Sequence, residues 1–294
     1  MTIRTVGLVG GGTMGQGIAI TCAASGLDVL LREKSPDLAR ESMDGIGHAL
    51  DRDIAKWRRT QSEKKAILGR VRTLDEFDAL EKADIIIECV PEDLELKTSI
   101  FQRLDNICPP EDILATNTSS LSVTEIGART RRSDRVIGLH FLQPVPQVPL
   151  VEVVRGLGTS ESTFRQALDF VRVLGKTGIE VFEYPGYVTT RVILPFLNEA
   201  MHVVMEGVAT PEAVDTSMKL GYGLPVGPLA LADRIGLDEV SRWMQYLFEE
   251  LGDLKYRPCP LLRKMIRAGH LGVKSGRGFF EYDDDGNPKS APAK

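Results

Sequence analysis

The chain has 294 residues, of which 43% are apolar, and a formal net charge of −5 at pH 7. This length suits one large or two ordinary domains, and the apolar fraction is that of a globular protein. The negative charge balance gives no electrostatic footprint for nucleic acid or for acidic membranes.

Targeting and redox signals are weak. No apolar run approaches the roughly 18 residues that a membrane span needs. The apolar stretch at residues 6–9 runs into a glycine turn and not into a signal-peptide cleavage site. The four cysteines are scattered without metal-ligand spacing: Cys22, Cys89, Cys108 and Cys259. We therefore expect a cytoplasmic protein with inert thiols and no metal, whose partners include neither membrane nor nucleic acid.

Residues 1–35 have the pattern of a dinucleotide-binding unit: strand, glycine turn, helix, strand and acid. Gly10 permits a tight turn, Gly12 lets a pyrophosphate approach the backbone, and Gly15 lets the helix pack against the sheet. The N-terminus of that helix supplies free N–H groups for phosphates. We expect the turn to bind the cofactor through Gly10, Gly12, Thr13, Met14 and Gly15. A glycine-rich turn that binds nothing is the alternative.

Glu33 is expected to set the choice of cofactor. It ends the second strand, about 18 residues after Gly15. A carboxylate there accepts hydrogen bonds from both ribose hydroxyls and repels a 2′-phosphate. The sequence therefore favours NAD over NADP, with a positive charge, Lys34, next to the acid.

A long helix is predicted from Pro36 to about Arg59, because its apolar residues recur at helical spacing. Gly45 and Gly47 interrupt this pattern. The charged side chains of the helix, Lys56 among them, form either a solvated mixed-charge face or a site for the phosphates of a ligand.

Strands and helices alternate from residue 62 to residue 181. The predicted helices are 62–69, 94–104, 121–128 and 161–174, and the predicted strands are 70–73, 84–88, 113–116, 136–140, 150–154 and 176–181. Such alternation implies a parallel sheet covered on both faces, with ligands at the carboxyl ends of the strands. Four polar segments follow those ends and are expected to meet in one crevice: residues 10–12, 88–92, 117–120 and 140–143.

The composition changes after Pro185-Gly186, which marks the predicted domain boundary. Helices are predicted at 188–206, 211–220, 228–233, 236–251 and 260–268, and an apolar run follows at 278–282. The predicted fold class is therefore α/β, with a Rossmann-type parallel sheet over residues 1–185 and a second, all-helical domain over residues 186–294. Helix 188–206 is apolar on more than one face, which suggests burial against another subunit of a homodimer.

His140 ends a buried strand in the predicted crevice, and Glu152 lies near it if the chain folds back through the loop at 144–146. A carboxylate on one imidazole nitrogen fixes the tautomer. The other nitrogen can then take a proton from a substrate alcohol while hydride leaves for a nicotinamide. A purely structural hydrogen bond is the alternative. We expect the other histidines to be structural or exposed: His48, His202 and His270.

Ser119 and Ser120 follow Asn117 at a strand end. Their hydroxyls can donate to a substrate carbonyl or to the cofactor carboxamide. The alternative is an N-cap for the next helix, with Ser120 or Ser122 capping toward Glu125. The two roles can coexist.

Five segments together resemble the L-3-hydroxyacyl-CoA dehydrogenase family. They are residues 10–19 (GGGTMGQGIA), 115–122 (ATNTSSLS), 136–141 (VIGLHF), 150–154 (LVEVV) and 272–280 (GVKSGRGFF). The similarity spans almost the whole chain in order and spacing. The bacterial 3-hydroxybutyryl-CoA dehydrogenases are the branch nearest in length and layout.

The resemblance implies an N-terminal NAD domain, a helical C-terminal substrate and dimerisation domain, and a role in fatty acid metabolism. The implied reaction is the reversible oxidation of a (3S)-3-hydroxyacyl-CoA to the 3-oxoacyl-CoA. By match to the family motifs, His140 is the general base, Glu152 its partner, and Ser119 a serine near nicotinamide and substrate. The remaining matches are Glu92, Lys97 and Lys274 with the cofactor, and Lys56 with the CoA part of the substrate.

Several positions depart from the family pattern. Thr190 stands where the family usually has an asparagine that reaches the substrate, and Asn198 lies about two turns further along the same helix. Gln143 replaces an asparagine beside the cofactor, Gln147-Val148-Pro149 replaces a Val-Met-Lys run, and Ala49 replaces a serine on the CoA-contacting helix. We retain Thr190 as a candidate for the catalytic and substrate sites, and Asn117 and Gln143 as candidates for the cofactor site.

Three functions remain open. The first is an NAD-dependent 3-hydroxyacyl-CoA dehydrogenase that prefers short chains. The second keeps the chemistry but acts on a carrier-protein thioester or on a free hydroxy acid, as in the gulonate dehydrogenases of the λ-crystallin type, which residues 90–97 resemble. The third, motivated by Thr190, is a catalytically inactive NAD-binding protein.

Overall fold

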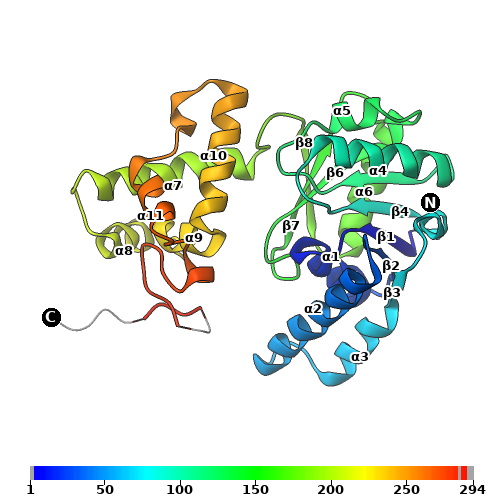
Figure 1. The fold of residues 1–294 in the computed structure, drawn as a ribbon, viewed down its shortest axis with the longest axis horizontal. Coiled ribbons are helices and arrows are strands. Elements are labelled where there is room, and N and C mark those ends of the chain that lie inside the picture. The colour runs from blue at the N-terminus through cyan, green and yellow to red at the C-terminus, as the bar shows by residue number, and fades with distance from the viewer. Residues whose placement is uncertain (1–2, 284–285, 290–294) are drawn as a thin grey trace. The chain divides into compact units, whose positions relative to one another are not determined.

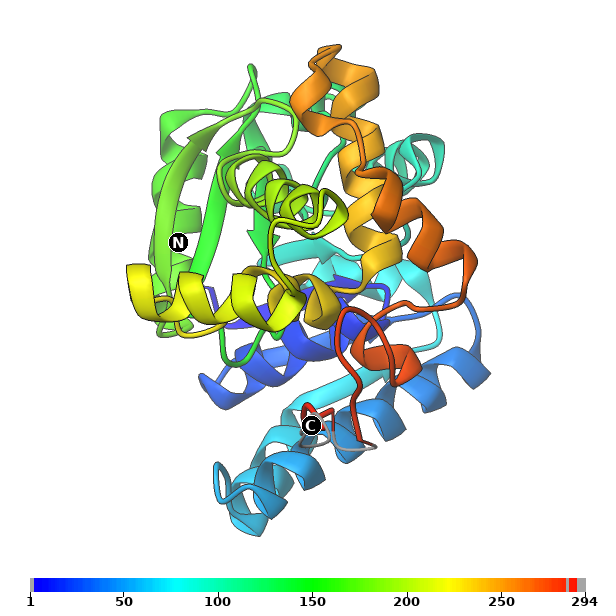
Figure 2. The ribbon, with the colours of Figure 1, turned by 90° about the vertical axis from the view of Figure 1, so that its left-hand side faces the viewer.

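The protein divides into two compact units, Met1–Tyr187 and Val188–Lys294. The computed structural model describes residues 3–283 and 286–289. Figure 1 labels the helices and strands of both units, and Figure 2 shows the same ribbon turned by 90°.

The first unit is built on an eight-stranded sheet with the order β3-β2-β1-β4-β5-β6-β7-β8. The strands are β1 (Thr5–Val9), β2 (Asp28–Arg32), β3 (Val71–Leu74), β4 (Ile85–Glu88), β5 (Ile113–Thr116), β6 (Val136–Phe141), β7 (Leu150–Arg155) and β8 (Thr177–Phe182). The strand order reverses between β1 and β4, which lie side by side and parallel. Ligands of open α/β sheets bind outside the carboxyl ends of the strands at such a reversal.

Helices cover both faces of this sheet. They are α1 (Thr13–Ala24), α2 (Pro36–Ala55), α3 (Gln61–Arg70), α4 (Leu94–Ile107), α5 (Val123–Ala128) and α6 (Glu161–Val173), with short 3₁₀ segments at Phe77–Lys82 and Ser133–Arg135. Successive residues of a strand point to opposite faces. Ile85 and Ile87 accordingly enter a core with α1, α2, α3 and α6, whereas Ile86 enters a second core with α4 and α5.

The sheet departs from the expected parallel arrangement at one pair. β6 and β7 are antiparallel, and β8 is parallel to β7, so the last two strands run opposite to the first six. The connection at residues 142–149 is too short for the crossover that a parallel pair needs, which takes a dozen or more residues. As a result, β6 and β7 exchange cross-strand side-chain pairs directly.

Helix α2 is shorter than predicted. Ser35 caps its start by accepting from the backbone N–H of Leu38 at 3.3 Å, and Pro36 occupies the first turn. The helix ends at Ala55 and not near Arg59, because Trp57 adopts a φ of 56°. A left-handed residue cannot continue a right-handed helix.

The second unit is helical. Its helices are α7 (Thr189–Met205), α8 (Pro211–Tyr222), α9 (Pro228–Ile235), α10 (Leu237–Leu251) and α11 (Pro260–Arg267), with 3₁₀ turns at Leu254–Tyr256 and Val273–Ser275. The run at 278–282 forms isolated bridges, such as Arg277 with Glu281, and not a regular strand. Buried Asp233 fixes this run, because it accepts from the backbone N–H groups of Phe279 and Phe280 at 3.0 Å.

Candidate active site

The glycine turn has the geometry that a bound pyrophosphate requires. Gly10 leaves β1 with a φ of 100°, and a Cβ on Gly15 would lie 2.0 Å from the carbonyl oxygen of Gly10. A Cβ on Gly12 would meet no atom within 4 Å, so the space beside Gly12 is open. No side chain caps α1, and its first turn holds no acid. Its first N–H groups are thus available to an anion, and these residues fit a dinucleotide.

Glu33 lies against the glycine turn. Its Oε1 accepts from the backbone N–H of Gly11 and, at 3.5 Å, from the hydroxyl of Ser42, and its Oε2 accepts from the N–H of Lys34 at 3.0 Å. These bonds hold the carboxylate at the end of β2, beside the glycine turn. Sequence reasoning missed Ser42, a buried residue of α2 that lies against both Gly11 and Glu33.

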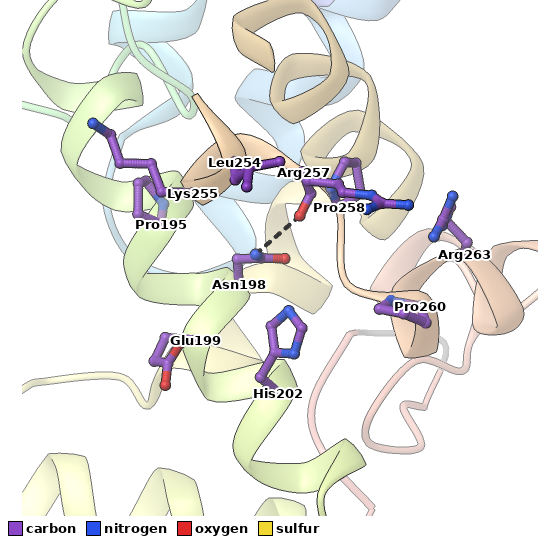
Figure 3. Close-up of a pocket in the computed structure, with 10 residues that line it drawn as sticks. All are labelled: Pro195, Asn198, Glu199, His202, Leu254, Lys255, Arg257, Pro258, Pro260 and Arg263. Atoms are coloured by element: carbon purple, nitrogen blue, oxygen red, sulfur yellow. Dashed lines mark hydrogen bonds between the residues drawn. The ribbon is translucent and has the colours of Figure 1, made fainter. Parts of the chain in front are cut away.

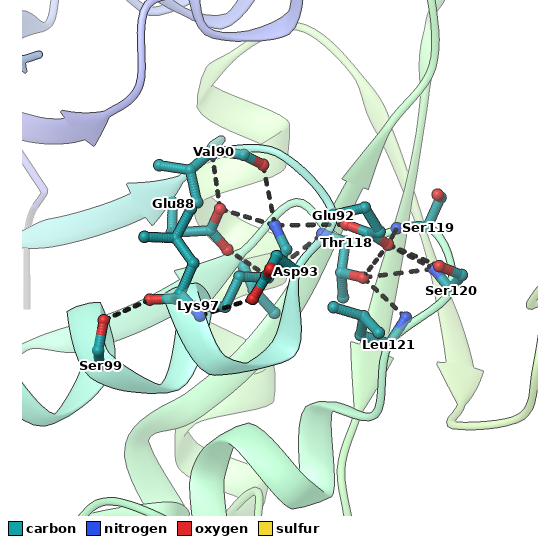
Figure 4. Close-up of polar contacts among 12 residues, drawn as sticks. Glu88, Val90, Glu92, Asp93, Lys97, Ser99, Thr118, Ser119, Ser120 and Leu121 are labelled. Carbon is teal, nitrogen blue, oxygen red and sulfur yellow. Dashed lines mark hydrogen bonds and ion pairs between the residues drawn. The ribbon is translucent and has the colours of Figure 1, made fainter. Parts of the chain in front are cut away.

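A buried ion pair lies at the carboxyl end of β4 (Figure 4). Lys97 Nζ is 2.7 Å from Glu88 Oε1, and both side chains are at most 1% exposed. The same ammonium lies 3.2 Å from the carbonyl oxygen of Val90 and 3.3 Å from Glu92 Oε2. Burial lowers the pKa of Lys97, but the carboxylates of Glu88 and Glu92 outweigh this effect and hold the pKa above its usual value.

Glu92 connects this ion pair to the loop from Thr118 to Ser120, called the serine loop below. Its Oε1 accepts from the backbone N–H groups of Ser119 at 3.1 Å and Ser120 at 3.0 Å, and from the hydroxyls of Thr118 and Ser120. Burial raises the pKa of Glu92, but Lys97 and the hydroxyl donors outweigh it and set the pKa below its usual value. Glu92 accepts a hydrogen bond from the backbone N–H of Ser119 and not from its hydroxyl. This carboxylate therefore does not occupy the Ser119 hydroxyl, which can bind a ligand.

The N-cap of α5 is Ser122, whose hydroxyl accepts from the N–H of Glu125 at 2.9 Å. Of the two caps considered from the sequence, Ser122 therefore fills the role, while Ser120 binds Glu92.

Asn117 ties three strand ends together. Its Oδ1 accepts from the N–H of Phe141 in β6 at 2.9 Å, and its own N–H donates to the carbonyl of Glu88 in β4 at 2.9 Å. Asn117 itself follows β5 directly. The amide thus helps to hold the polar segments that follow β4, β5 and β6 at one edge of the sheet.

His140 and Glu152 are direct cross-strand partners in the β6–β7 pair. His140 Nδ1 lies 2.6 Å from Glu152 Oε2, with side chains 7% and 0% exposed. The Tyr187 ring is tilted by 59° against the imidazole, with the centroids 5.4 Å apart. Sequence reasoning missed Tyr187, which is buried and has a φ of 47°.

The remaining candidates lie on other elements. Gln143 is exposed in the loop after β6, and Lys56 is exposed just past the end of α2. Thr190 and Lys274 belong to the second unit. Thr190 is 7% exposed in the first turn of α7, and Lys274 Nζ lies 2.6 Å from Asp238 Oδ2.

Asn198 has a structural role within the second unit. Its amide donates to the carbonyl of Arg257 at 3.2 Å and accepts from the N–H of Cys259 at 2.9 Å. It lines a pocket of about 690 Å³ (Figure 3), whose other walls are Pro195, Glu199, His202, Leu254, Lys255, Arg257, Pro258, Pro260 and Arg263. None of the predicted catalytic or cofactor residues lines this pocket.

Among residues 3–283 and 286–289, no three His, Cys, Asp or Glu side chains are grouped to hold a metal ion. Within the same ranges, the helices are too short or too polar to cross a membrane.

The sheet, its glycine turn and the acid at the end of β2 are those of an NAD-dependent dehydrogenase. Residues 5–184 match the NAD-binding domain of 3-hydroxyacyl-CoA dehydrogenase, and residues 186–282 match its C-terminal domain. The chain belongs to the 3-hydroxyacyl-CoA dehydrogenase family.

Individual relatives are similar over nearly the whole chain. A Bacillus subtilis protein named "Probable 3-hydroxybutyryl-CoA dehydrogenase" is 49% identical over 97% of this chain and 99% of its own length. A Bradyrhizobium diazoefficiens 3-hydroxybutyryl-CoA dehydrogenase is 44% identical over 95% of this chain and 96% of its own. The crystal structure of a Ralstonia eutropha (S)-3-hydroxybutyryl-CoA dehydrogenase aligns with a TM-score of 0.89 at 44% identity, covering 96% of this chain and 100% of that one.

Proposed function

We propose that the protein catalyses the NAD-dependent, reversible oxidation of a short-chain (3S)-3-hydroxyacyl-CoA to the 3-oxoacyl-CoA. The observation that carries this proposal is the buried His140–Glu152 pair, with 2.6 Å between Nδ1 and Oε2, in the same sheet as the dinucleotide turn. The names of the relatives, at 44% and 49% identity, support the substrate class.

The pair orients the imidazole for proton transfer. An ionised carboxylate only accepts hydrogen bonds, so His140 Nδ1 donates to Glu152 and Nε2 keeps its lone pair. During oxidation, Nε2 takes the proton of the substrate C3 hydroxyl, and the O–H electron pair becomes the carbonyl π bond. When bound, NAD would supply the acceptor for the hydride at C3. In the reverse direction, protonated His140 returns the proton to the oxygen.

Other residues would hold the two ligands. We infer that Gly12 and the N-terminus of α1 receive the pyrophosphate, that Glu33 receives the ribose hydroxyls, and that the Ser119 hydroxyl faces nicotinamide and substrate. We retain as proposals Asn117, Glu92, Gln143 and Lys274 for the cofactor, and Lys56 and Thr190 for the substrate. Lys97, whose ammonium already contacts Glu88, Val90 and Glu92, would act on the cofactor through Glu92.

The test is NADH oxidation with acetoacetyl-CoA, measured beside free acetoacetate, on the native protein and on Thr190→Asn. Thr210→Asn is the control, because asparagine caps a helix as well as the threonine that caps α8. Strong native turnover of the CoA ester alone supports the proposal and shows that threonine is tolerated.

Other outcomes would revise the function. Preference for free acetoacetate would favour a free hydroxy acid. Little native turnover on the CoA ester that Thr190→Asn restores would mean that Thr190 retunes the site, and would favour a carrier-bound or unusual hydroxy acid. Tight NADH binding without turnover in either form would favour an inactive NAD-binding protein.

We also propose that the protein is a cytoplasmic homodimer joined through its second unit. Apolar side chains on that unit are strongly exposed in the single chain, including Val192 at 67%, Val208 at 72% and Leu220 at 83%. All four cysteines are free thiols, which suits a reducing compartment. Light scattering coupled to gel filtration should give the mass of a dimer; a monomer mass would contradict the assembly, and cell fractionation checks the compartment.

A further inference from the structure

Glu88 has no role in the chemistry outlined above, yet it is a fully buried carboxylate with several donors. Its side chain is 0% exposed. Oε1 accepts from Lys97 Nζ at 2.7 Å and from the N–H of Val90 at 2.6 Å, and Oε2 accepts from the hydroxyl of Thr116 at 2.8 Å. A buried charge is tolerated only when it is paired and hydrogen-bonded in this way.

Lys97 is fully engaged by this network. An ammonium has three N–H donors, and three oxygens lie within 3.3 Å of Nζ, from Glu88, Val90 and Glu92. The side chain is 1% exposed. Lys97 therefore influences the site through Glu92 and not by direct contact with a ligand.

The two carboxylate oxygens of Glu92 have different partners. Oε2 faces Lys97 at 3.3 Å, while Oε1 gathers the donors of the loop from Thr118 to Ser120. Figure 4 shows Glu92 between the Lys97 side chain and this loop. The orientation of Glu92, and with it the backbone that presents Ser119, depends on where Lys97 is held.

We propose that Glu88 is a positioning residue, which anchors Lys97 so that Glu92 stays turned toward the loop that presents Ser119. Glu88, Lys97 and Glu92 carry alternating charges, so each holds the next in place from the end of β4 to the loop from Thr118 to Ser120. Without the negative charge of Glu88, Glu92 becomes the remaining carboxylate partner of Lys97 and is drawn toward it. The loop then loses its shared acceptor, and Ser119 loses its fixed direction.

The experiment is a double-mutant cycle on the full chain with Glu88→Gln and Glu92→Gln. The readouts are kcat and KM for acetoacetyl-CoA, NADH affinity from fluorescence, and Tm. Glu88→Gln keeps the side-chain shape and is expected to lower kcat and NADH affinity by about tenfold each, through misplacement of the loop, with a smaller change in KM. Because Glu88 acts through Glu92, the double variant should lose little more than Glu92→Gln alone.

Asp105→Asn is the matched control. Asp105 is buried in the last turn of the same helix α4 and lies 2.7 Å from Arg132 Nε. Its loss should lower Tm without changing kcat or NADH affinity. If Glu88→Gln does not fold, Glu88→Asp keeps the charge but shortens the side chain that anchors Lys97, and it should move kcat in the same direction.

Unchanged kcat and NADH affinity in Glu88→Gln, or effects that multiply with those of Glu92→Gln, would overturn the proposal and leave Glu88 a purely structural residue. This inference rests on the proposed function, but the two fail separately. A native protein inert on acetoacetyl-CoA would refute the function, while NADH affinity across the cycle would still decide the role of Glu88.

Discussion

The substitution Glu152→Gln tests the chemistry of the imidazole with little change in shape. Glu152 is fully buried in β7 opposite His140. A carboxylate forces Nδ1 to carry the proton, whereas an amide can donate its own N–H to Nδ1 and so place the proton on Nε2. Nε2 would then lack the lone pair that receives the substrate proton.

The size of the effect follows from that loss. Proton transfer by a positioned side chain contributes about 10²–10⁴-fold, so kcat should fall within that range, equal to about 3–5 kcal/mol in the barrier. KM should change much less, because the residue does not need to touch the substrate. Tm should remain close to native, since a neutral amide replaces a buried charge.

The assay is steady-state NADH oxidation with acetoacetyl-CoA at fixed ionic strength. Glu180→Gln is the matched control: Glu180 lies on the neighbouring strand β8, and its carboxylate is partly exposed, 2.9 Å from Arg155. The control should keep native kcat. An effect of Glu152→Gln confined to KM, or equal losses in both variants, would refute the catalytic role of the pair.

Two further predictions concern cofactor choice and stability. Glu33→Ala should weaken NAD binding and reduce discrimination against NADP, and unchanged constants for both cofactors would reject the ribose assignment. Burial, with Glu111 and Asp84 nearby, raises the pKa of Asp112 to about 7 from 3.8. Ionised Asp112 therefore costs stability above pH 7, and the cost shrinks as pH falls from 7 toward 3.8. Asp112→Asn should raise Tm by about 2–4 °C near pH 8 and by less near pH 5; equal gains would contradict this reasoning.

Local patterns predicted most of the helices and strands and the glycine turn after β1, although α2 ends earlier than expected. Gly10, Gly15 and Glu33 lie in one continuous stretch, where chain connectivity alone brings them together. The expectation that polar segments meet at the carboxyl ends of the strands also placed Glu92 near the serine loop. The backbone N–H groups of Ser119 and Ser120 donate to Glu92, 27 and 28 residues away in the sequence.

Features that depend on strand direction and on burial could not be predicted from local sequence patterns alone. The antiparallel direction of β6 and β7 follows from the length of a loop and not from a strand pattern, so the sequence predicted Glu152 beside His140 only on condition that the chain folds back there, as it does. Glu88 reads as the end of a strand, and its pairing with Lys97 requires the packing of α4 on β4. Tyr187 follows the predicted domain boundary and carries no motif of its own.

The most direct measurement of the central claim is NAD reduction with (3S)-3-hydroxybutyryl-CoA by the native protein and by His140→Ala, with NADH affinity measured on both. The native protein should turn over this substrate, and His140→Ala should lose at least about 10²-fold in kcat while binding NADH normally. Turnover that survives in His140→Ala, or a native protein that binds NADH but leaves this substrate unchanged, would contradict the account.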